Sequence, residues 1–358
     1  DTFFFSRSDL KEAMKHLPRY FRVRKRKSAA RYILSKMILF SRGKSELSEI
    51  DTNHLWKMHE EGLSRLVQLS NTDPQYIPSF KSTDGEISLM DVKYELARRI
   101  FTDCVLCEHK CHVDRTKKIG WCKVGRPYLS SDFLHMGEEP ELIPSHTFFF
   151  SGCTLKCVFC QNWDISQNPK AGVTVNDRDI IKRIEKKSDR SVNVNWVGGD
   201  PTPNIPFILE VMLNMDLNIP QVWNSNMYLS ATSMRLLEGV VDVYLTDFKY
   251  GNNECGKRLS KVDHYWDVVK HNHVEASRQG ELVVRHLVMP GHYNCCTEPI
   301  LRFIGEILDK GSLRINVMGQ YRPEYKAHKH ADIARRPIMD EIDKCKELAR
   351  DLGLSLCE

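Results

Sequence analysis

The sequence lacks the features that mark several classes of protein. It contains no run of about 18 apolar residues, and its mean hydropathy is −0.42, which together exclude a membrane-spanning protein. Glycine accounts for only 19 of 358 residues, far from the third that a collagen requires, and 41% hydrophobic residues are too many for a wholly disordered chain. No repeat of fixed period and no low-complexity tract is present. We therefore expect a globular protein with one large domain and a smaller appendage.

Positive charge is concentrated at one end of the sequence. Residues 1–50 hold 13 Lys+Arg against 5 Asp+Glu, whereas the whole chain has a formal net charge of only +5. Such a basic arm could attract nucleic acid, an acidic membrane surface or an acidic protein, and a solvated, partly helical extension is the simpler interpretation. We expect the arm and the helices after it to dock a protein substrate, and we do not expect nucleic acid as a partner.

Twelve cysteines are present, and their clustering favours metal or redox chemistry in a reducing compartment, for which the cytoplasm is the default. Four of them follow the pattern Cys104-x2-Cys107-x3-Cys111-x10-Cys122 and offer a complete ligand set. Zinc and an auxiliary iron–sulfur cluster both suit four thiolates, and a segment without metal is a third alternative. Polar and basic residues separate these thiols, so we expect a loop here. Cys255, Cys295 and Cys296 could react with substrate or serve as secondary ligands, although buried inert thiols are the simpler interpretation, and no role is expected for Cys345 and Cys357.

From residue 147 onward, short apolar runs alternate with helical patterns. Strands are expected at 147–150, 192–197, 219–223, 241–246, 282–288 and 313–318. Helices are expected at about 176–187, 205–216, 230–239, 259–271, 297–309 and 338–351. Six strand–helix units predict an α/β fold, a partial (β/α)6 barrel whose working edge lies at the carboxyl ends of its parallel strands.

These patterns divide the chain into three parts. Residues 1–100 form a basic, mainly helical accessory region, with helices expected at 28–40, 54–69 and 91–101. Residues 101–145 are the cysteine-rich, metal-binding segment, and residues 146–358 are the partial barrel.

Three further cysteines directly follow the first strand of the barrel. Cys153, Cys157 and Cys160 lie within eight residues, close enough for one loop to fold around one metal centre. Three thiolates are one fewer than a cubane cluster normally has, so a [4Fe–4S] cluster here would leave one iron open to a substrate or cofactor. A structural zinc site would require a fourth ligand, and none is near in the sequence.

This C-x3-C-x2-C motif, with the aromatic Phe159 before its last cysteine, resembles the signature of the radical S-adenosylmethionine (SAM) superfamily. The segments HTFFFSGCTLKCVFCQNWDISQ, WVGGDPTP, WNSNMYLS, YLTDFKYGNNEC and VRHLVMPGHYNCC resemble, more narrowly, the PflX-like relatives of pyruvate formate-lyase activating enzymes. The resemblance implies that the three cysteines hold a [4Fe–4S] cluster whose open iron is chelated by SAM. Reduction of the cluster then cleaves SAM to a 5′-deoxyadenosyl radical.

The resemblance also implies which residues contact SAM. Gly198 and Gly199 bind its amino group, with Asp200 where relatives have Glu, while Asn224 and Ser225 bind the ribose. Asp247 marks a cation site, and Lys249 lies near the SAM carboxylate. Phe159 and Arg285 are the remaining expected cofactor contacts. Each has a structural alternative: a turn for the glycines, a helix cap for Asn224 and Ser225, and a simple salt bridge for Asp247 and Lys249.

The relatives act on protein glycyl residues or peptides, and an open barrel has a wide lateral mouth. We therefore expect a protein or peptide substrate, with an electron donor such as flavodoxin or ferredoxin. One alternative is a cobalamin-dependent C-methyltransferase of a peptide residue, although no D-x-H-x-x-G motif is present. Others are a glycyl-radical-enzyme activase and, remotely, a non-enzymatic metal-binding nucleic-acid module.

Overall fold

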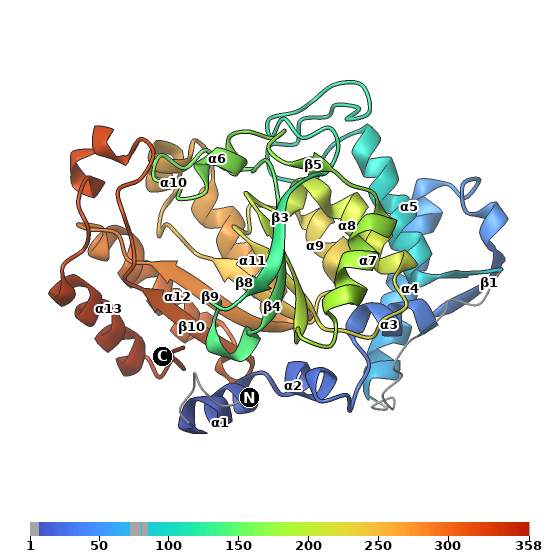
Figure 1. The fold of residues 1–358 in the computed structure, drawn as a ribbon, viewed down its shortest axis with the longest axis horizontal. Coiled ribbons are helices and arrows are strands. Elements are labelled where there is room, and N and C mark those ends of the chain that lie inside the picture. Colours follow the sequence, from blue (N-terminus) through green and yellow to red (C-terminus); the bar gives the residue numbers. More distant parts are fainter. Residues whose placement is uncertain (1–6, 72–79, 81–84, 358) are drawn as a thin grey trace.

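A computed structural model describes residues 7–71, 80 and 85–357 and is built on one central sheet (Figure 1). Its strands are β3 (Tyr128–His135), β4 (Ser145–Phe150), β5 (Val173–Thr174), β6 (Asn193–Gly198), β7 (Gln221–Ser225), β8 (Val243–Asp247), β9 (Glu281–Leu287) and β10 (Leu313–Met318). Their order across the sheet is β10-β9-β8-β7-β6-β4-β3-β5. The pairs from β4 to β10 are all parallel, and β3 is antiparallel to both β4 and β5.

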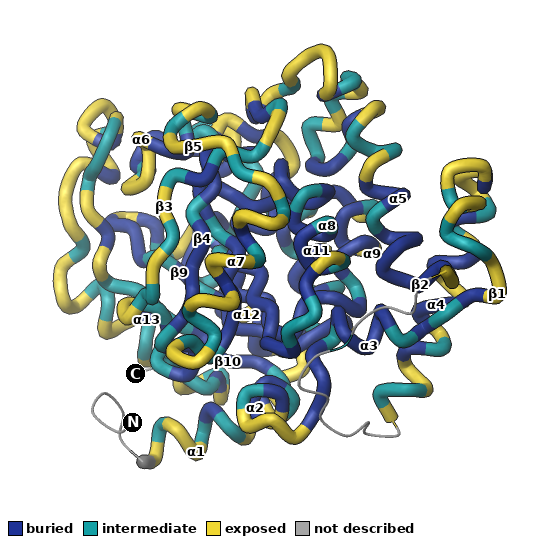
Figure 2. Tube along the Cα trace, turned by 45° about the vertical axis from the view of Figure 1, so that its right-hand side comes forward, coloured by how far each residue is buried: buried dark blue, intermediate teal, exposed yellow. Residues whose placement is uncertain are grey.

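The six parallel strands are the six that the sequence predicts, and the partial barrel is confirmed. Nearly all of their residues are buried, and the strands carry buried polar side chains such as Asn193, Asn195 and Asn224 beside the apolar ones. Aromatic side chains fill the centre of the sheet: Trp196 stacks on Phe148 at 5.4 Å between ring centroids, and both are fully buried. Figure 2 shows the buried strands inside a more exposed shell of helices and loops.

The barrel helices mostly match their predicted ranges. They are α6 (Trp163–Ser166), α7 (Asp177–Lys187), α8 (Ile205–Asn214), α9 (Ala231–Leu237), α10 (Asn253–Ser260), α11 (Tyr265–Gln279), α12 (Glu298–Ile307) and α13 (Met339–Asp351). Short helical turns are η2 (Pro140–Leu142), η3 (Thr202–Asn204), η4 (Tyr293–Thr297), η5 (Lys310–Ser312), η6 (Ala327–Lys329) and η7 (Ala331–Ile333). The single helix expected at 259–271 is wrong: Lys261 and His264 both adopt positive φ, of 60° and 53°, and so separate α10 from α11.

The accessory region is mainly helical, as expected, but it also contains a small antiparallel sheet. Its elements are α3 (Arg31–Met37), β1 (Leu39–Gly43), η1 (Lys44–Glu46), α4 (Thr52–Asn71), β2 (Glu86–Ser88) and α5 (Leu89–Thr102). The helix expected at 28–40 therefore ends early, because its last residues pair as β1 with β2. α5 packs on α8, where Tyr94 Oη donates to Glu210 Oε1 at 2.7 Å.

The basic arm is not a solvated extension. It forms α1 (Arg7–His16) and α2 (Pro18–Arg24), which lie beneath the sheet at the bottom of Figure 1. Leu17, Tyr20 and Phe21 are buried in a cluster of their own with side chains of the strands. The other members of this cluster are Ala13, Leu142, Val222, Val243, Leu245 and Val283. The arm thus covers the amino-terminal end of the sheet. The prediction of a solvated extension is wrong, because the apolar residues of the arm are buried against the strands.

A buried carboxylate fixes the arm in place. Glu281, the first residue of β9, accepts hydrogen bonds from the backbone N–H groups of Arg19 at 2.6 Å and Tyr20 at 2.8 Å. Arg19 and Tyr20 belong to the first turn of α2, whose N–H groups have no partner within the helix.

Within the described residues, no helix combines the length and the apolar character that crossing a bilayer would need.

Candidate functional site

The three-cysteine loop begins where β4 ends and lies at the carboxyl edge of the sheet, as predicted. The backbone N–H groups of Lys156 and Val158 donate to the carbonyls of Ser260 at 2.9 Å and Leu259 at 2.8 Å. The loop is therefore held against the last turn of α10. Gly152 N donates to the Ile165 carbonyl at 3.0 Å, which joins the loop to α6. These bonds fix the loop without help from a ligand.

Each thiol of this loop has a hydrogen-bond partner. Leu155 N donates to Cys153 Sγ at 3.3 Å, Ser260 Oγ lies 2.9 Å from Cys157 Sγ, and Ser166 Oγ lies 3.2 Å from Cys160 Sγ. Hydrogen bonds to sulfur are one means by which proteins tune iron–sulfur clusters. Sequence reasoning missed both serines, because Ser260 is remote in sequence and Ser166 carries no motif signal.

Burial raises the pKa of two of these thiols, Cys153 and Cys157, and so favours their neutral form. The pKa of Cys153 is well above its usual range because the side chain is desolvated, and burial raises the pKa of Cys157 to about 11 although Lys249 opposes it. Metal binding deprotonates a coordinating thiol outright. The donor set therefore fits a metal cluster, which would supply the compensating charge.

The spacing of the sulfurs separates a cluster from a single ion. In a tetrahedral zinc site, Zn–S bonds of about 2.3 Å place the sulfurs about 3.8 Å apart. Among the described residues, no three sulfurs of Cys153, Cys157 and Cys160, or of the 104–122 segment, all lie within 4.8 Å of one another. A cubane binds each thiolate on a different iron and so takes wider spacing. The sulfurs of both groups are thus spaced more widely than one tetrahedral ion would require.

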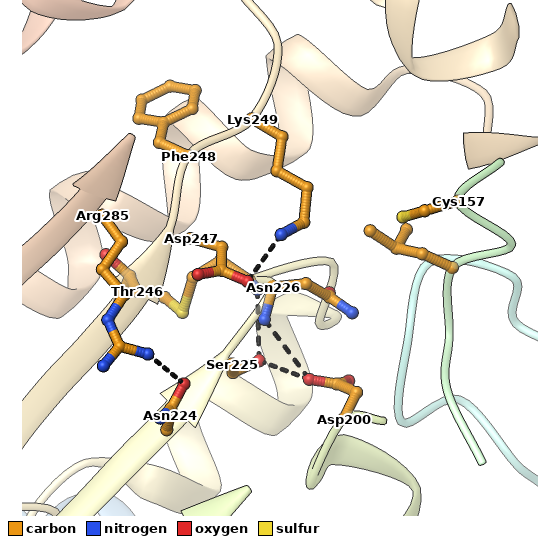
Figure 3. Close-up of polar contacts among 12 residues, drawn as sticks. Cys157, Asp200, Asn224, Ser225, Asn226, Thr246, Asp247, Phe248, Lys249 and Arg285 are labelled. Atoms are coloured by element: carbon orange, nitrogen blue, oxygen red, sulfur yellow. Dashed lines mark hydrogen bonds and ion pairs between the residues drawn. The ribbon is translucent and has the colours of Figure 1, made fainter. Parts of the chain in front are cut away.

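A buried polar network lies beside the cluster loop (Figure 3). Asp200, after β6, accepts from Ser225 Oγ at 2.8 Å and from Thr154 Oγ1 at 3.2 Å. Asn226 Nδ2 donates to Thr154 Oγ1 at 3.0 Å and lies 3.5 Å from Cys153 Sγ. Burial raises the pKa of Asp200 to about 6, against the hydrogen bonds that stabilise its carboxylate. The contacts that join Asp200 to Ser225, Thr154 and Asn226 come from different elements and could not be found from sequence, and the roles predicted for Asp200 and Ser225 toward SAM stay predictions.

The predicted D-x-K pair at the end of β8 is present. Lys249 Nζ lies 2.6 Å from Asp247 Oδ2, and Figure 3 shows the Lys249 side chain reaching to the Asp247 carboxylate. Burial by itself would lower the pKa of Lys249, but nearby negative groups, Asp247 foremost among them, together outweigh burial and raise that pKa. Lys249 is therefore a cation beside the cysteine loop. This geometry agrees equally with the predicted SAM carboxylate site and with a simple salt bridge, so the contact of Lys249 with SAM stays a prediction.

Arg285 lies in the same region with its guanidinium already paired. It forms ion pairs with Glu138 and with Glu139, and its Nε donates to Glu139 Oε1 at 2.7 Å. Its Nη1 also donates to Asn224 Oδ1 at 3.4 Å (Figure 3). The pairing of Arg285 with Glu138 and Glu139 could not be predicted, because no motif in the sequence marks these two glutamates. His286 faces the other way and bonds to the Phe248 carbonyl at 2.8 Å, so the predicted alternation on this strand holds.

The glycines and the aromatic residue of the motifs have structural roles in the fold. Gly198 adopts φ +128°, and a Cβ there would overlap the backbone of Phe150; one at Gly199 would overlap Gly152. Both glycines are thus required for β6 to approach β4 and the cluster loop. Phe159 is buried edge-on against Tyr250 and Tyr321. Their contacts with SAM stay predictions.

The second cysteine segment is irregular, as expected, and packs against the cluster loop. Cys104, Cys107 and Cys122 are buried and Cys111 is partly buried. Trp121 N donates to Cys111 Sγ at 3.3 Å. The Thr154 carbonyl, within the three-cysteine loop, is contacted by both His109 Nε2 at 2.8 Å and Trp121 Nε1 at 3.1 Å. The two thiol groups therefore belong to one connected structure.

Comparisons with known proteins agree with this geometry. Residues 147–304 match the family model described as Radical SAM superfamily. The uncharacterized protein MJ0674 of Methanocaldococcus jannaschii is 48% identical over 346 residues, which cover 95% of this chain and 98% of that protein.

The solved structures to which the chain is similar are more distant in sequence. Streptococcus suis SuiB bound to S-adenosylmethionine is 14% identical with a TM-score of 0.44, covering 57% of this chain and 47% of that one. The chain thus spans about half the length of SuiB. Methylornithine synthase (PylB) is 14% identical with a TM-score of 0.42, covering 94% and 77% of the two chains. QueE from Escherichia coli is 12% identical with a TM-score of 0.37, covering 64% and 92%.

The family model covers the strands β4 to β9 and the cysteine loop that follows β4, the same part of the chain in which the sequence motif and the parallel sheet coincide. The chain therefore belongs to the radical SAM superfamily and is an enzyme.

Proposed function

We propose that Cys153, Cys157 and Cys160 hold a [4Fe–4S] cluster at which SAM is reductively cleaved, and that the resulting 5′-deoxyadenosyl radical abstracts hydrogen from a protein or peptide. The observation that carries the proposal is the position of the three thiols. They lie at the carboxyl edge of a parallel sheet, each with a hydrogen-bond partner, beside the cation of Lys249. That edge is where α/β folds bind their ligands.

The strand ends supply charges that complement SAM. SAM carries a carboxylate, an ammonium and a sulfonium. Lys249 offers a positive charge to the carboxylate, and the buried Asp200 offers a negative one to a cationic group when it is ionised. Ser225, Asn224 and Arg285 add hydrogen-bonding groups on neighbouring strands. These residues bind and orient the cofactor; the cluster supplies the electron.

A protein or peptide is the proposed substrate class. The sheet is open: β10 and β5 are its two edge strands and do not pair with each other in the described structure. An incompletely closed barrel admits an extended segment from the side more readily than a closed one. The methyltransferase and activase alternatives use the same radical step and differ in what happens to the substrate afterwards.

The thiols of Cys104, Cys107, Cys111 and Cys122 are proposed to bind an auxiliary iron–sulfur cluster rather than zinc. Their spacing supports this, as argued above. Contact with the Thr154 carbonyl places the segment against the cluster loop. A second cluster here would suit electron transfer to the first.

The test is anaerobic purification followed by iron, sulfide, zinc and cobalt analysis and an assay with SAM and a reductant. About eight irons per chain and 5′-deoxyadenosine by mass spectrometry are expected, falling to about four irons without cleavage in Cys157→Ala. Cys345→Ala, which removes a buried thiol on α13, is the matched control and should keep both. Cleavage that survives Cys157→Ala would refute the assignment.

The products distinguish the alternatives. S-adenosylhomocysteine with retained cobalt would favour the methyltransferase, and a glycyl radical in a partner protein would favour the activase. About four irons with zinc that is lost on Cys111→Ser would make the 104–122 segment a zinc site.

A further inference from the structure

A third group of metal-ligating side chains lies apart from both cysteine segments. Cys255 is in the first turn of α10, while His292 and Cys295 follow β9. Their two sulfurs and one imidazole nitrogen all lie within 4.8 Å of one another. In the described part of the chain, this is the only set of three His, Cys, Asp or Glu ligands that is so compact. The fold brings these ligands together from two separate loops.

We propose that Cys255, His292 and Cys295 bind a single zinc ion. Two thiolates and an imidazole are donors that zinc prefers. A tetrahedral zinc ion holds its ligand atoms about 3.8 Å apart, so shifts of about 1 Å would close the site. The compact spacing of these three ligands, which the other thiols do not share, therefore suits one ion. The proposal is independent of the proposed function.

The imidazole of His292 is prepared for this role. Its Nδ1 lies 2.9 Å from the Pro290 carbonyl, so Nδ1–H donates there and Nε2 carries the lone pair. Arg258 Nη2 lies 3.1 Å from Nε2, and Asp332 Oδ2 lies 3.4 Å from it. Arg258 is also ion-paired with Asp332 at 2.6 Å. The arginine thus keeps a partner when an ion takes the lone pair.

One side chain joins the two loops that carry the thiols. Asn252 caps α10 with its Oδ1, which accepts from Cys255 N at 2.7 Å. Its Nδ2 donates to the Cys295 carbonyl at 2.7 Å and lies 3.5 Å from Cys255 Sγ. Gly251 allows close approach, because a Cβ there would lie 2.8 Å from the Cys295 carbonyl oxygen. Hydrogen bonds of the Asn252 side chain therefore hold the two segments that carry the thiols next to each other.

The site has one open side. Cys255 and His292 are buried, whereas Cys295 is exposed, so an ion can enter from solvent. Three protein ligands leave one tetrahedral position for water or for a further thiol. Cys296 offers such a thiol: its sulfur lies 3.8 Å from that of Cys295, and its side chain is fully buried.

An ion here would affect the cluster loop through α10. The same helix that begins beside Cys255 ends at Ser260, which contacts Cys157 and accepts from Lys156. Zinc would tie the start of α10 to the chain after β9. The cluster loop would then rest on a helix that is fixed at both ends.

The first test measures zinc in the anaerobically purified full chain with its clusters. About one zinc per chain is expected in the wild type, and a loss of at least about fivefold in Cys255→Ser and in Cys295→Ser. Cys345→Ser and Cys111→Ser are matched controls that should keep it. Equal zinc in all five proteins, or loss only in Cys111→Ser, would overturn the proposal, and neither result bears on SAM cleavage.

The second test needs no variant and so does not depend on how the serine proteins fold. The wild-type chain, stripped of zinc with a chelator and reloaded with zinc alone, is alkylated, and Cys295 is followed by peptide mass spectrometry. Zinc is expected to slow alkylation of Cys295 about tenfold, because a metal-bound thiolate is protected. An unchanged rate, or a disulfide between Cys255 and Cys295 in the purified protein, would overturn the zinc site.

Discussion

Replacing Leu17 with alanine tests whether the basic arm is part of the fold. Leu17 joins α1 to α2 and has 0% of its surface exposed. It packs beneath the sheet in the same cluster as Val222, Val243 and Val283. If the arm were a solvated docking extension, the substitution would change the free energy of unfolding by less than about 0.5 kcal/mol.

The structure predicts a much larger effect. Replacing a fully buried leucine with alanine lowers the free energy of unfolding of a protein by about 3 to 5 kcal/mol, because the transfer free energy of the removed atoms is lost and a cavity remains. We expect about 3 kcal/mol here, since the cluster lies at the end of the sheet, where its neighbours can relax. With a urea m-value of about 3 kcal/mol per M, the unfolding midpoint falls by about 1 M.

The assay is anaerobic urea unfolding followed by tryptophan fluorescence and circular dichroism. Lys27→Ala, an exposed position directly after α2, is the control and should leave the midpoint unchanged. Leu17→Ala and Lys27→Ala proteins with the same midpoint would refute the packing argument. Loss of substrate modification in Leu17→Ala with an unchanged midpoint would return the arm to a docking role.

Three further predictions follow from the site and the arm. Lys249→Ala should weaken SAM binding at least about tenfold without loss of iron, because the substitution removes a buried cation beside Asp247. Equilibrium binding measurements and iron analysis test this prediction, and an unchanged affinity for SAM would contradict it. Burial raises the pKa of Glu281 to about 7, against the opposing charges of Arg19 and Arg31. The folded state then holds a proton that the unfolded state releases near pH 4.5, so this group makes the protein about 2 kcal/mol less stable at pH 8 than at about pH 5.5. Glu281→Gln should lack this contribution in urea unfolding at the two pH values; the same pH dependence in both proteins would exclude it. Cys160→Ala, like Cys157→Ala, should abolish formation of 5′-deoxyadenosine, and retained product in the mass-spectrometric assay would count against a three-cysteine cluster.

The parallel core was predictable from sequence because buried strands are continuous apolar runs. The two antiparallel strands at the edge were not, since β3 alternates irregularly between half-buried and exposed residues and β5 is only two residues long. The arm was misjudged for a related reason. Its many cations dominate the composition, whereas the residues that pack, such as Tyr20 and Phe21, contact strands that are far away in sequence.

The residues of the candidate site also include some that the sequence predicts and some that it does not. The pairing of Asp247 with Lys249 was predictable because the two residues are close in sequence at the end of β8, although Lys249 lies two residues beyond the strand. The contacts of Ser260 with Cys157 and of Glu139 with Arg285 join different elements, and no local pattern encodes them. The proposed role of His292 as a metal ligand could not be predicted from sequence, because it depends on the fold that brings His292 close to Cys255.

α1 and α2 precede the strands that bury them, so they leave the ribosome long before their packing partners exist. Until β7, β8 and β9 have been synthesised, Leu17, Tyr20 and Phe21 face solvent in a growing chain. The cations around them, Arg22 and Lys25 included, repel like segments of neighbouring nascent chains and so oppose aggregation. The charge of the arm thereby serves the synthesis of the protein, and the apolar face beneath it serves the finished fold.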